Sequence, residues 1–93
     1  MSMGWAAARK LRRAVDGLAR VLAVEVLTAA RAIDLRSPLA PSPAGRLAIA
    51  AVAPFAGAPG PDIFLAPVLE NARAVISGRE LRAAIEAEIG ALL

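Results

Sequence analysis

The chain has 93 residues, of which 58% are hydrophobic and 3% aromatic, with a net charge of +3 from 11 Lys and Arg against 8 Asp and Glu. It contains no Cys, His or Tyr, which excludes disulfides, thiol catalysis, Cys-type metal sites and the usual general acid–base groups near neutral pH. Ordinary domains are about 45–50% apolar with Gly counted, so this chain is unusually apolar. A chain of this length forms one domain or less, and short chains bury a small fraction of their surface. We therefore expect its apolar surface to contact another chain or a further part of the same protein.

One long helix with two unlike halves is predicted over residues 5–35. At about 100° per residue, an apolar stripe follows one side of it for its whole length. The opposite side is charged as far as Arg20 and then carries Val24 and Leu27, so the second half is apolar most of the way round. Helices of that kind are buried in a bundle or at a subunit interface. The stripe consists of Leu11, Val15, Leu18, Leu22, Val26, Ala29 and Ile33.

A proline-rich strap over residues 37–43 follows the long helix. Pro38 disfavours the helical conformation at Ser37, which places the end of the helix just before it. The three prolines of the segment favour an extended, polyproline-like path. Its last two residues, Ser42 and Pro43, are typical of a helix start, with the hydroxyl as cap and proline in the first helical position.

Two or three shorter helices are predicted beyond the strap, and no segment shows the sustained alternation of a strand. The first should end at about Ala53, because Pro54 follows it, and residues 55–62 should form a loop. The next should begin near Pro67, and Gly78 suits the left-handed position after its end. The last should cover about residues 79–92, with apolar side chains at Leu81, Ile85, Ile89 and Leu92.

The predicted fold is therefore all-α and forms a piece of a larger helical bundle. It consists of a long helix over 1–36, the strap over 37–43 and short helices over 44–93. Charged residues interrupt the apolar run that follows the basic cluster, which argues against a secretory signal and against a span of about 20 apolar residues. We expect a cytoplasmic chain that binds no membrane. The interrupting residues are Asp16, Arg20, Glu25 and Arg31.

The basic cluster, defined as Arg9, Lys10, Arg12 and Arg13, is one candidate binding site. It could bind phosphate, but no aromatic residues interleave with it, as they do in nucleic-acid platforms. Asp16 lies three or four residues from Arg12, Arg13 and Arg20, so it offers them a local partner. The pattern favours a solvated or interface face over nucleic acid.

Glu25 is the most unusual single residue, because it lies at the edge of the apolar stripe. A buried carboxylate must be paired or shift its pKa upward, so Glu25 is either a catalytic acid or, as we favour, a partner of an Arg on a neighbouring helix or subunit. Trp5 is interpreted as core or interface rather than a ligand platform.

Two further motifs carry no predicted site. Gly57 and Gly60 lie among prolines, but the pattern lacks the Lys-Ser/Thr and the preceding strand of a phosphate loop. Glu86 and Glu88 have metal-ligand spacing, but they point to different sides of a helix.

Several short segments are distinctive when taken together: Ser2-Met3-Gly4, Ala-Ala-Arg-Lys-Leu-Arg-Arg at 7–13, Leu-Ala-Val-Glu-Val-Leu at 22–27, Ala-Ile-Asp-Leu-Arg at 32–36 and Pro-Leu-Ala-Pro-Ser-Pro at 38–43. In these the chain resembles the C-terminal part of the aromatic amino acid ammonia-lyases, and among them the histidine-specific enzymes. The resemblance is close over 2–43 and looser beyond, at 61–62, 65–67 and 86–90. Ile63 departs from it, since the family usually has a basic residue there.

The resemblance implies a mostly helical homotetramer that eliminates ammonia from an amino acid without oxidation, through a methylidene-imidazolone ring formed from Ala-Ser-Gly. This chain has neither that tripeptide nor any of the tyrosines that the family uses in catalysis. Of the family's Glu-Asp-His-Val-Ser-Met-Gly motif only the last three residues are present, and the active-site glutamate would lie just before residue 1. We therefore expect no catalytic, cofactor-binding or metal-binding residue here.

The role implied is that of a scaffold and subunit interface, with Val24 and Leu27 buried against other helices of the intact enzyme. That enzyme would convert L-histidine to urocanate and ammonia, whereas this chain alone is expected to be inactive. Its partners would be the rest of the enzyme or other subunits.

Met1 stands where the family has Val, and we hypothesise an internal GUG codon read as a start. Two alternatives remain: a stand-alone helical oligomerisation protein and a small basic nucleic-acid-binding protein.

Overall fold

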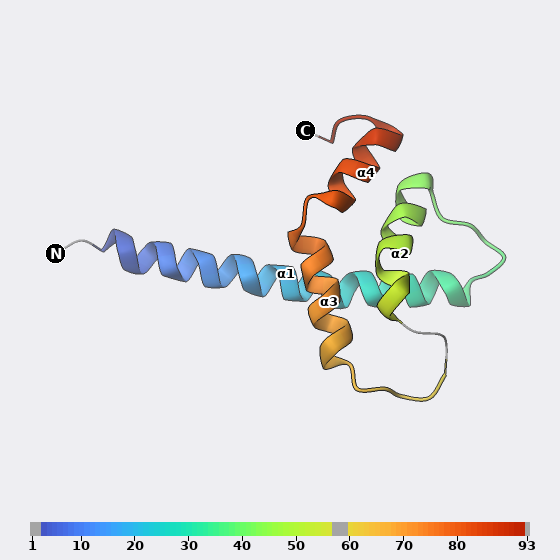
Figure 1. The fold of residues 1–93 in the computed structure, drawn as a ribbon, viewed down its shortest axis with the longest axis horizontal. Helices are drawn as coiled ribbons and strands as arrows, with labels where there is room; N and C mark the ends of the chain where they lie inside the picture. The colour runs from blue at the N-terminus through green and yellow to red at the C-terminus, as the bar shows by residue number, and fades with distance from the viewer. Residues whose placement is uncertain (1–2, 57–59, 93) are drawn as a thin grey trace.

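The computed structural model describes residues 3–56 and 60–92, and these form four α-helices and no strand. Figure 1 shows the longest helix, α1, running the length of the molecule, with the three short helices gathered along its C-terminal half. The N-terminal half of α1 projects alone. The all-α prediction is confirmed. The helices are α1 (Gly4–Leu35), α2 (Pro43–Ala56), α3 (Ala66–Ser77) and α4 (Glu80–Ile89).

Helix α1 ends where the sequence predicts. Its last turn closes with Arg36 N donating to Ile33 O at 3.1 Å and Ser37 N donating to Asp34 O at 3.1 Å. The Ser37–Pro38 peptide is cis, and the chain leaves the helix through a turn. The strap then runs without regular structure to α2.

Helix α2 starts as predicted but ends later than predicted. Gly45 N donates to Ser42 Oγ at 3.1 Å, so the hydroxyl caps the helix and Pro43 is its first residue. The predicted stop at Pro54 is wrong, because the helix continues through Pro54 to Ala56. Proline removes a single hydrogen bond, and Phe55 and Ala56, both half-buried, gain packing from the extra turn.

Gly78, predicted to end α3 in the left-handed conformation, does not take that conformation. Gly78 follows α3 with φ −77° and ψ 170°, an extended conformation, so the predicted left-handed cap is wrong. A Cβ at Gly78 would lie 2.6 Å from Oε2 of Glu80 and 3.3 Å from Ala74 O, so a larger residue here requires the flexible end of the Glu80 side chain to move. Gly90 instead takes φ +91° and ends α4 earlier than predicted.

The core of the chain is built mainly from alanine. Helix α3 crosses α1 steeply (Figure 1), and the side chains buried there are small, which lets the two backbones approach closely. Among the described residues, Val52 of α2 is the largest side chain that is fully buried. The buried residues are Ala19, Ala23, Val52 and Ala72.

Such a small core leaves the molecule extended. Its radius of gyration is 16.0 Å, against about 12 Å for a compact domain of this length. Its accessible surface is 7299 Å², which exceeds the surface expected for a compact monomer of this mass by about 2,300 Å². Within the described residues, no helix is both long and apolar enough to cross a membrane.

Candidate interface surface

The apolar stripe predicted on the long helix is covered only near its C-terminal end. Val26 and Ile33 are half-buried, whereas Leu11, Val15 and Leu18 are well exposed. Helix α3 packs against α1, whose buried residues Ala19 and Ala23 lie on a neighbouring face, and the stripe stays uncovered along the first half of the helix. The α1 seam is defined as the four exposed residues of this part of the stripe, Leu11, Val15, Leu18 and Leu22.

The other residues that the sequence singled out on α1 are exposed in this chain. Glu25 is solvent-exposed, so its predicted burial is not found within the chain, and its pairing with another subunit stays a prediction. Trp5 is 71% exposed and belongs to no core here. Val24 is 50% exposed and Leu27 half-buried, because the short helices cover one side of α1 only.

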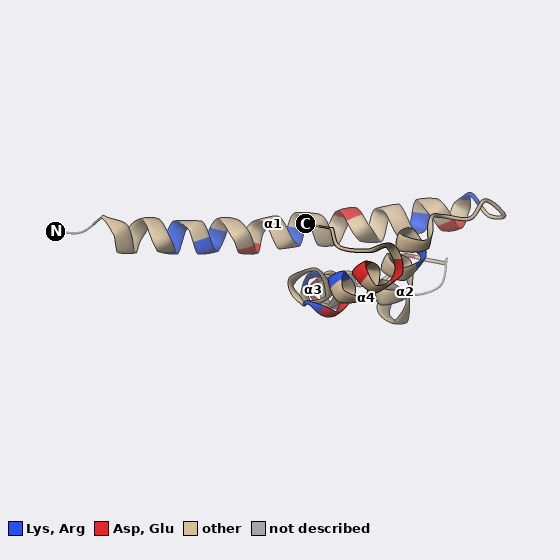
Figure 2. Ribbon diagram, turned by 90° about the horizontal axis from the view of Figure 1, so that it is seen from above, with Lys and Arg blue, Asp and Glu red and all other residues tan. Residues whose placement is uncertain are grey.

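The basic cluster lies on the projecting half of α1, away from the short helices (Figure 2). All four of its side chains are exposed. Asp16, predicted to serve the arginines of its own helix, forms no ion pair with them in the part of the chain that the structure describes. The ion pairs found there are Arg31–Asp34, Arg73–Glu70 and Arg82–Glu86.

Asp16 and Arg20 act across the crossing of α1 and α3 instead. The pKa of Arg73 is raised, mainly by its hydrogen bond to Glu70 and to a lesser degree by Asp16. The pKa of Glu70 is lowered, mainly by Arg73 and to a lesser degree by Arg20. Both of these weaker effects between α1 and α3 are attractive.

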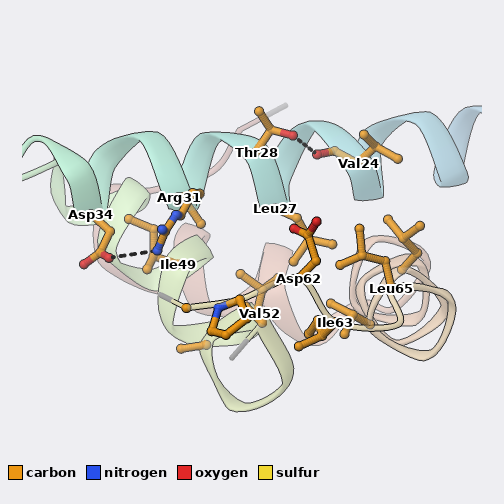
Figure 3. A pocket seen from close by; sticks show the side chains of 17 residues that line it. Val24, Leu27, Thr28, Arg31, Asp34, Ile49, Val52, Asp62, Ile63 and Leu65 are labelled. Atoms are coloured by element: carbon orange, nitrogen blue, oxygen red, sulfur yellow. Dashed lines mark hydrogen bonds and ion pairs between the residues drawn. The ribbon is translucent and has the colours of Figure 1, made fainter. Parts of the chain in front are cut away.

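A cleft of about 870 Å³ is lined by α1, α2, α3 and the segment before α3. Its walls are mainly aliphatic, with Leu27 and Val52 facing Ile63 and Leu65 (Figure 3). This cleft could not be identified from the sequence, because it is formed by elements far apart in the chain. The one signal for it was the apolar reverse side of α1, which includes Leu27.

Few polar groups line the cleft, and most of them are already engaged. Thr28 Oγ1 donates to Val24 O at 2.8 Å, and Arg31 Nη1 lies 3.9 Å from Asp34 Oδ2. Asp62 projects toward α1 from the segment before α3 (Figure 3). An open, mainly apolar cleft with these groups is suited to burial against another surface rather than to acid–base chemistry.

The remaining sequence candidates do not come together in a site. Glu86 is half-buried and accepts hydrogen bonds from Arg82 Nε at 2.8 Å and from Leu92 N at 3.4 Å, and Arg82 chiefly lowers its pKa. Glu88 is exposed. Gly60 lies in the described segment before α3, whereas Gly57 and Met1 lie outside the described residues.

Comparison with known proteins identifies the family of the chain. The model of a family described as aromatic amino acid lyase matches residues 1–54. The chain therefore belongs to the aromatic amino acid lyase family.

The named relatives are histidine ammonia-lyases. That of Streptomyces coelicolor is 53% identical over 93 residues, and that of Streptomyces griseus is 52% identical over 95 residues. The enzyme of Symbiobacterium thermophilum is 43% identical over 96 residues. Each alignment covers 99% of this chain but only 18% of the relative, so the chain spans a small part of their length. No solved structure matches the chain.

Proposed function

We propose that this chain is the scaffold and interface segment of a cytoplasmic histidine ammonia-lyase. The complete enzyme would convert L-histidine to urocanate and ammonia in histidine catabolism, and this segment would hold other parts of the enzyme, or other subunits, in place. The observation that carries the proposal is the exposure of the α1 seam in this chain. The chain is 53% identical to a histidine ammonia-lyase along nearly its whole length, so the remainder of such an enzyme is the partner that would cover the seam.

The energetics of the surface support this role. Burial of a Val or Leu side chain is worth about 1.5–3 kcal/mol, and the seam has four such side chains without a full set of neighbours in the chain. The cleft adds a second apolar surface on the C-terminal half of α1. Both surfaces would gain stability from a partner, whereas the alanine core within the chain offers little.

The residues present do not fit an independent active site. The chain holds no Ala-Ser-Gly tripeptide, so the family's methylidene-imidazolone ring cannot form from it, and it has no Tyr. The proposal therefore assigns no catalytic residue to this chain and no turnover to the chain alone.

Fragment complementation tests the proposal. Purified 1–93 should form no urocanate from L-histidine, and the Streptomyces coelicolor enzyme lacking its matching segment should also be inactive. Co-expression of the two should restore urocanate formation. The matched controls are Leu18→Asp in the seam, which should abolish rescue, and Leu35→Asp, an exposed position outside it, which should not. Turnover by 1–93 alone, or no rescue by a folded 1–93, would refute the proposal.

The alternative of a stand-alone oligomerisation protein is favoured by one observation, the projecting N-terminal half of α1. That function predicts self-association of 1–93 without any rescue of the truncated enzyme. The same co-expression experiment therefore separates the two functions.

A further inference from the structure

The cleft between the helices has an unbalanced charge. Among the described residues that line it, the charged ones are Arg31, Asp34 and Asp62, which are one cation and two carboxylates. Arg31 Nη1 lies 3.9 Å from Asp34 Oδ2, whereas Asp62 forms no ion pair with any described residue. One negative charge in the cleft is therefore left without a partner.

A rearrangement within the chain does not remove this excess. Asp62 projects toward α1 near Leu27, which lies one turn before Arg31 on the same helix (Figure 3). If the guanidinium of Arg31 turned to Asp62, Asp34 would lose its partner instead. The residue next to Asp62 is Ile63, which lines the cleft and brings no charge. A second positive charge has to come from outside this chain.

The need for that charge arises when the cleft is covered. Asp62 is exposed here, so water solvates its carboxylate. A covering surface made of apolar side chains alone would remove this water without pairing the carboxylate, and an unpaired buried charge costs far more than a few apolar contacts gain. A covering surface that brings a basic side chain keeps the apolar contacts and compensates the charge.

We infer that the cleft receives a segment of the rest of the enzyme in which an arginine, flanked by aliphatic side chains, pairs with Asp62. This inference rests on the proposed function, because it names the chemistry of the partner that the interface segment contacts. The chain covers 18% of the Streptomyces coelicolor histidine ammonia-lyase, so most of such an enzyme lies outside it and can supply the segment.

The form of the cleft agrees with such an occupant. Its volume of about 870 Å³ lies within the range of ligand sites, about 300–1,000 Å³, so it admits several side chains together. Pro61 restricts the backbone directly before Asp62, which limits the directions open to the carboxylate. Arginine suits this position better than lysine, because its planar guanidinium binds both oxygens of a carboxylate and is more weakly hydrated.

Three amphiphiles with the same aliphatic chain test the charge preference of the cleft: octylguanidinium, 1-octanol and octanoate. Each is titrated at low salt into isotope-labelled, full-length 1–93, and the amide chemical shifts of Leu27, Val52 and Leu65 report binding in the cleft. We expect octylguanidinium to bind about threefold more tightly than octanol, the gain of a partly exposed ion pair. Octanoate should bind more weakly than octanol.

Two variants assign this preference to one carboxylate. Asp62→Asn leaves Arg31 and Asp34 as a neutral pair, so octylguanidinium should lose its advantage over octanol. Glu88→Gln is the matched control, because it removes an exposed carboxylate of α4 that does not line the cleft, and it should keep the advantage. Circular dichroism of each variant checks that the helices form.

Co-expression with the truncated Streptomyces coelicolor enzyme tests the arginine itself. Asp62→Asn should lower the rescued urocanate formation at least about tenfold, because the partner's guanidinium would be buried without its carboxylate. Asp62→Glu, which keeps the charge, should retain most of the rescue. Ile63→Arg places a competing cation beside Asp62 and should lower the rescue as well, whereas Glu88→Gln should leave it unchanged.

The outcomes separate this inference from the proposed function. Equal affinities for the three amphiphiles, no binding in the cleft, or full rescue by Asp62→Asn would each overturn the inference. If wild-type 1–93 and Asp62→Asn rescue the truncated enzyme equally, the inference fails and the proposed function stands. If octylguanidinium is preferred through Asp62 but wild-type 1–93 restores no activity, the cleft selects a cation and the proposed enzyme role fails.

Discussion

Val52 is the position at which a small change should cost this chain the most. It is fully buried between α2 and its neighbours, and Val52→Ala removes two methylene equivalents, a loss of about 1.6 kcal/mol of transfer free energy. The cavity left behind adds up to about 1 kcal/mol. The higher helix propensity of alanine returns about 0.5 kcal/mol, so we expect a net loss of about 2 kcal/mol.

The matched control is Val24→Ala, the same replacement in a helix at a side chain that is half exposed. It has the same gain in helix propensity, so its effect should stay within about 0.5 kcal/mol. Urea unfolding at one protein concentration, followed by far-ultraviolet circular dichroism, measures both variants. Fluorescence of Trp5 is unsuitable, because that side chain is exposed on the projecting half of α1.

Equal unfolding midpoints for Val52→Ala and Val24→Ala would refute the reasoning. That result would mean that the short helices do not pack on α1 around Val52.

Two more predictions concern local features. Gly90→Ala should cost about 1–3 kcal/mol of local stability and speed amide exchange in the last turn of α4, because φ +91° strains an L-residue. Gly78→Ala should have a milder effect, since only the flexible end of the Glu80 side chain must move. Equal rates of amide exchange in the two variants would contradict this expectation. Arg73 lowers the pKa of Glu70 below 4.5 in the folded chain. The ion pair therefore stabilises the fold at pH values above the pKa of Glu70 in the unfolded chain, and this stabilisation is lost as the pH falls through the lower pKa of Glu70 in the folded chain. The urea midpoint should therefore drop more steeply below about pH 4.5 in the wild type than in Glu70→Gln, and parallel profiles would show that the pair contributes nothing.

The sequence predicted the helix ends where local chemistry decides them. Ser42 and Pro43 define the start of α2, because a hydroxyl cap and a missing N–H act within one turn. Pro54 misled the prediction, since packing of Phe55 and Ala56 outweighs the single hydrogen bond that proline removes. Gly78 misled it too, because glycine serves close approach as well as positive φ.

Which face of α1 packs within the chain could not be predicted from periodicity. The stripe is defined by its largest apolar residues, but a steep helix crossing selects small ones, and the residues buried in α1 and α3 are Ala19, Ala23 and Ala72. The cleft was missed for a related reason, because Leu27 and Ile63 meet only after α3 is placed. Tertiary contacts between distant segments decided both features.

The division of side chains along α1 has a physical consequence. The chain places alanines where its own helices meet and larger residues, Leu11, Val15 and Leu18, where it has no neighbour. Helices gain most of their stability from tertiary packing, and an isolated segment of about 15 residues is marginal in water. Under the proposed function, the first half of α1 would gain helical order from its partner. Formation of that helix and burial of the seam would then be two descriptions of one equilibrium, and a replacement that disturbs the seam should lower both together.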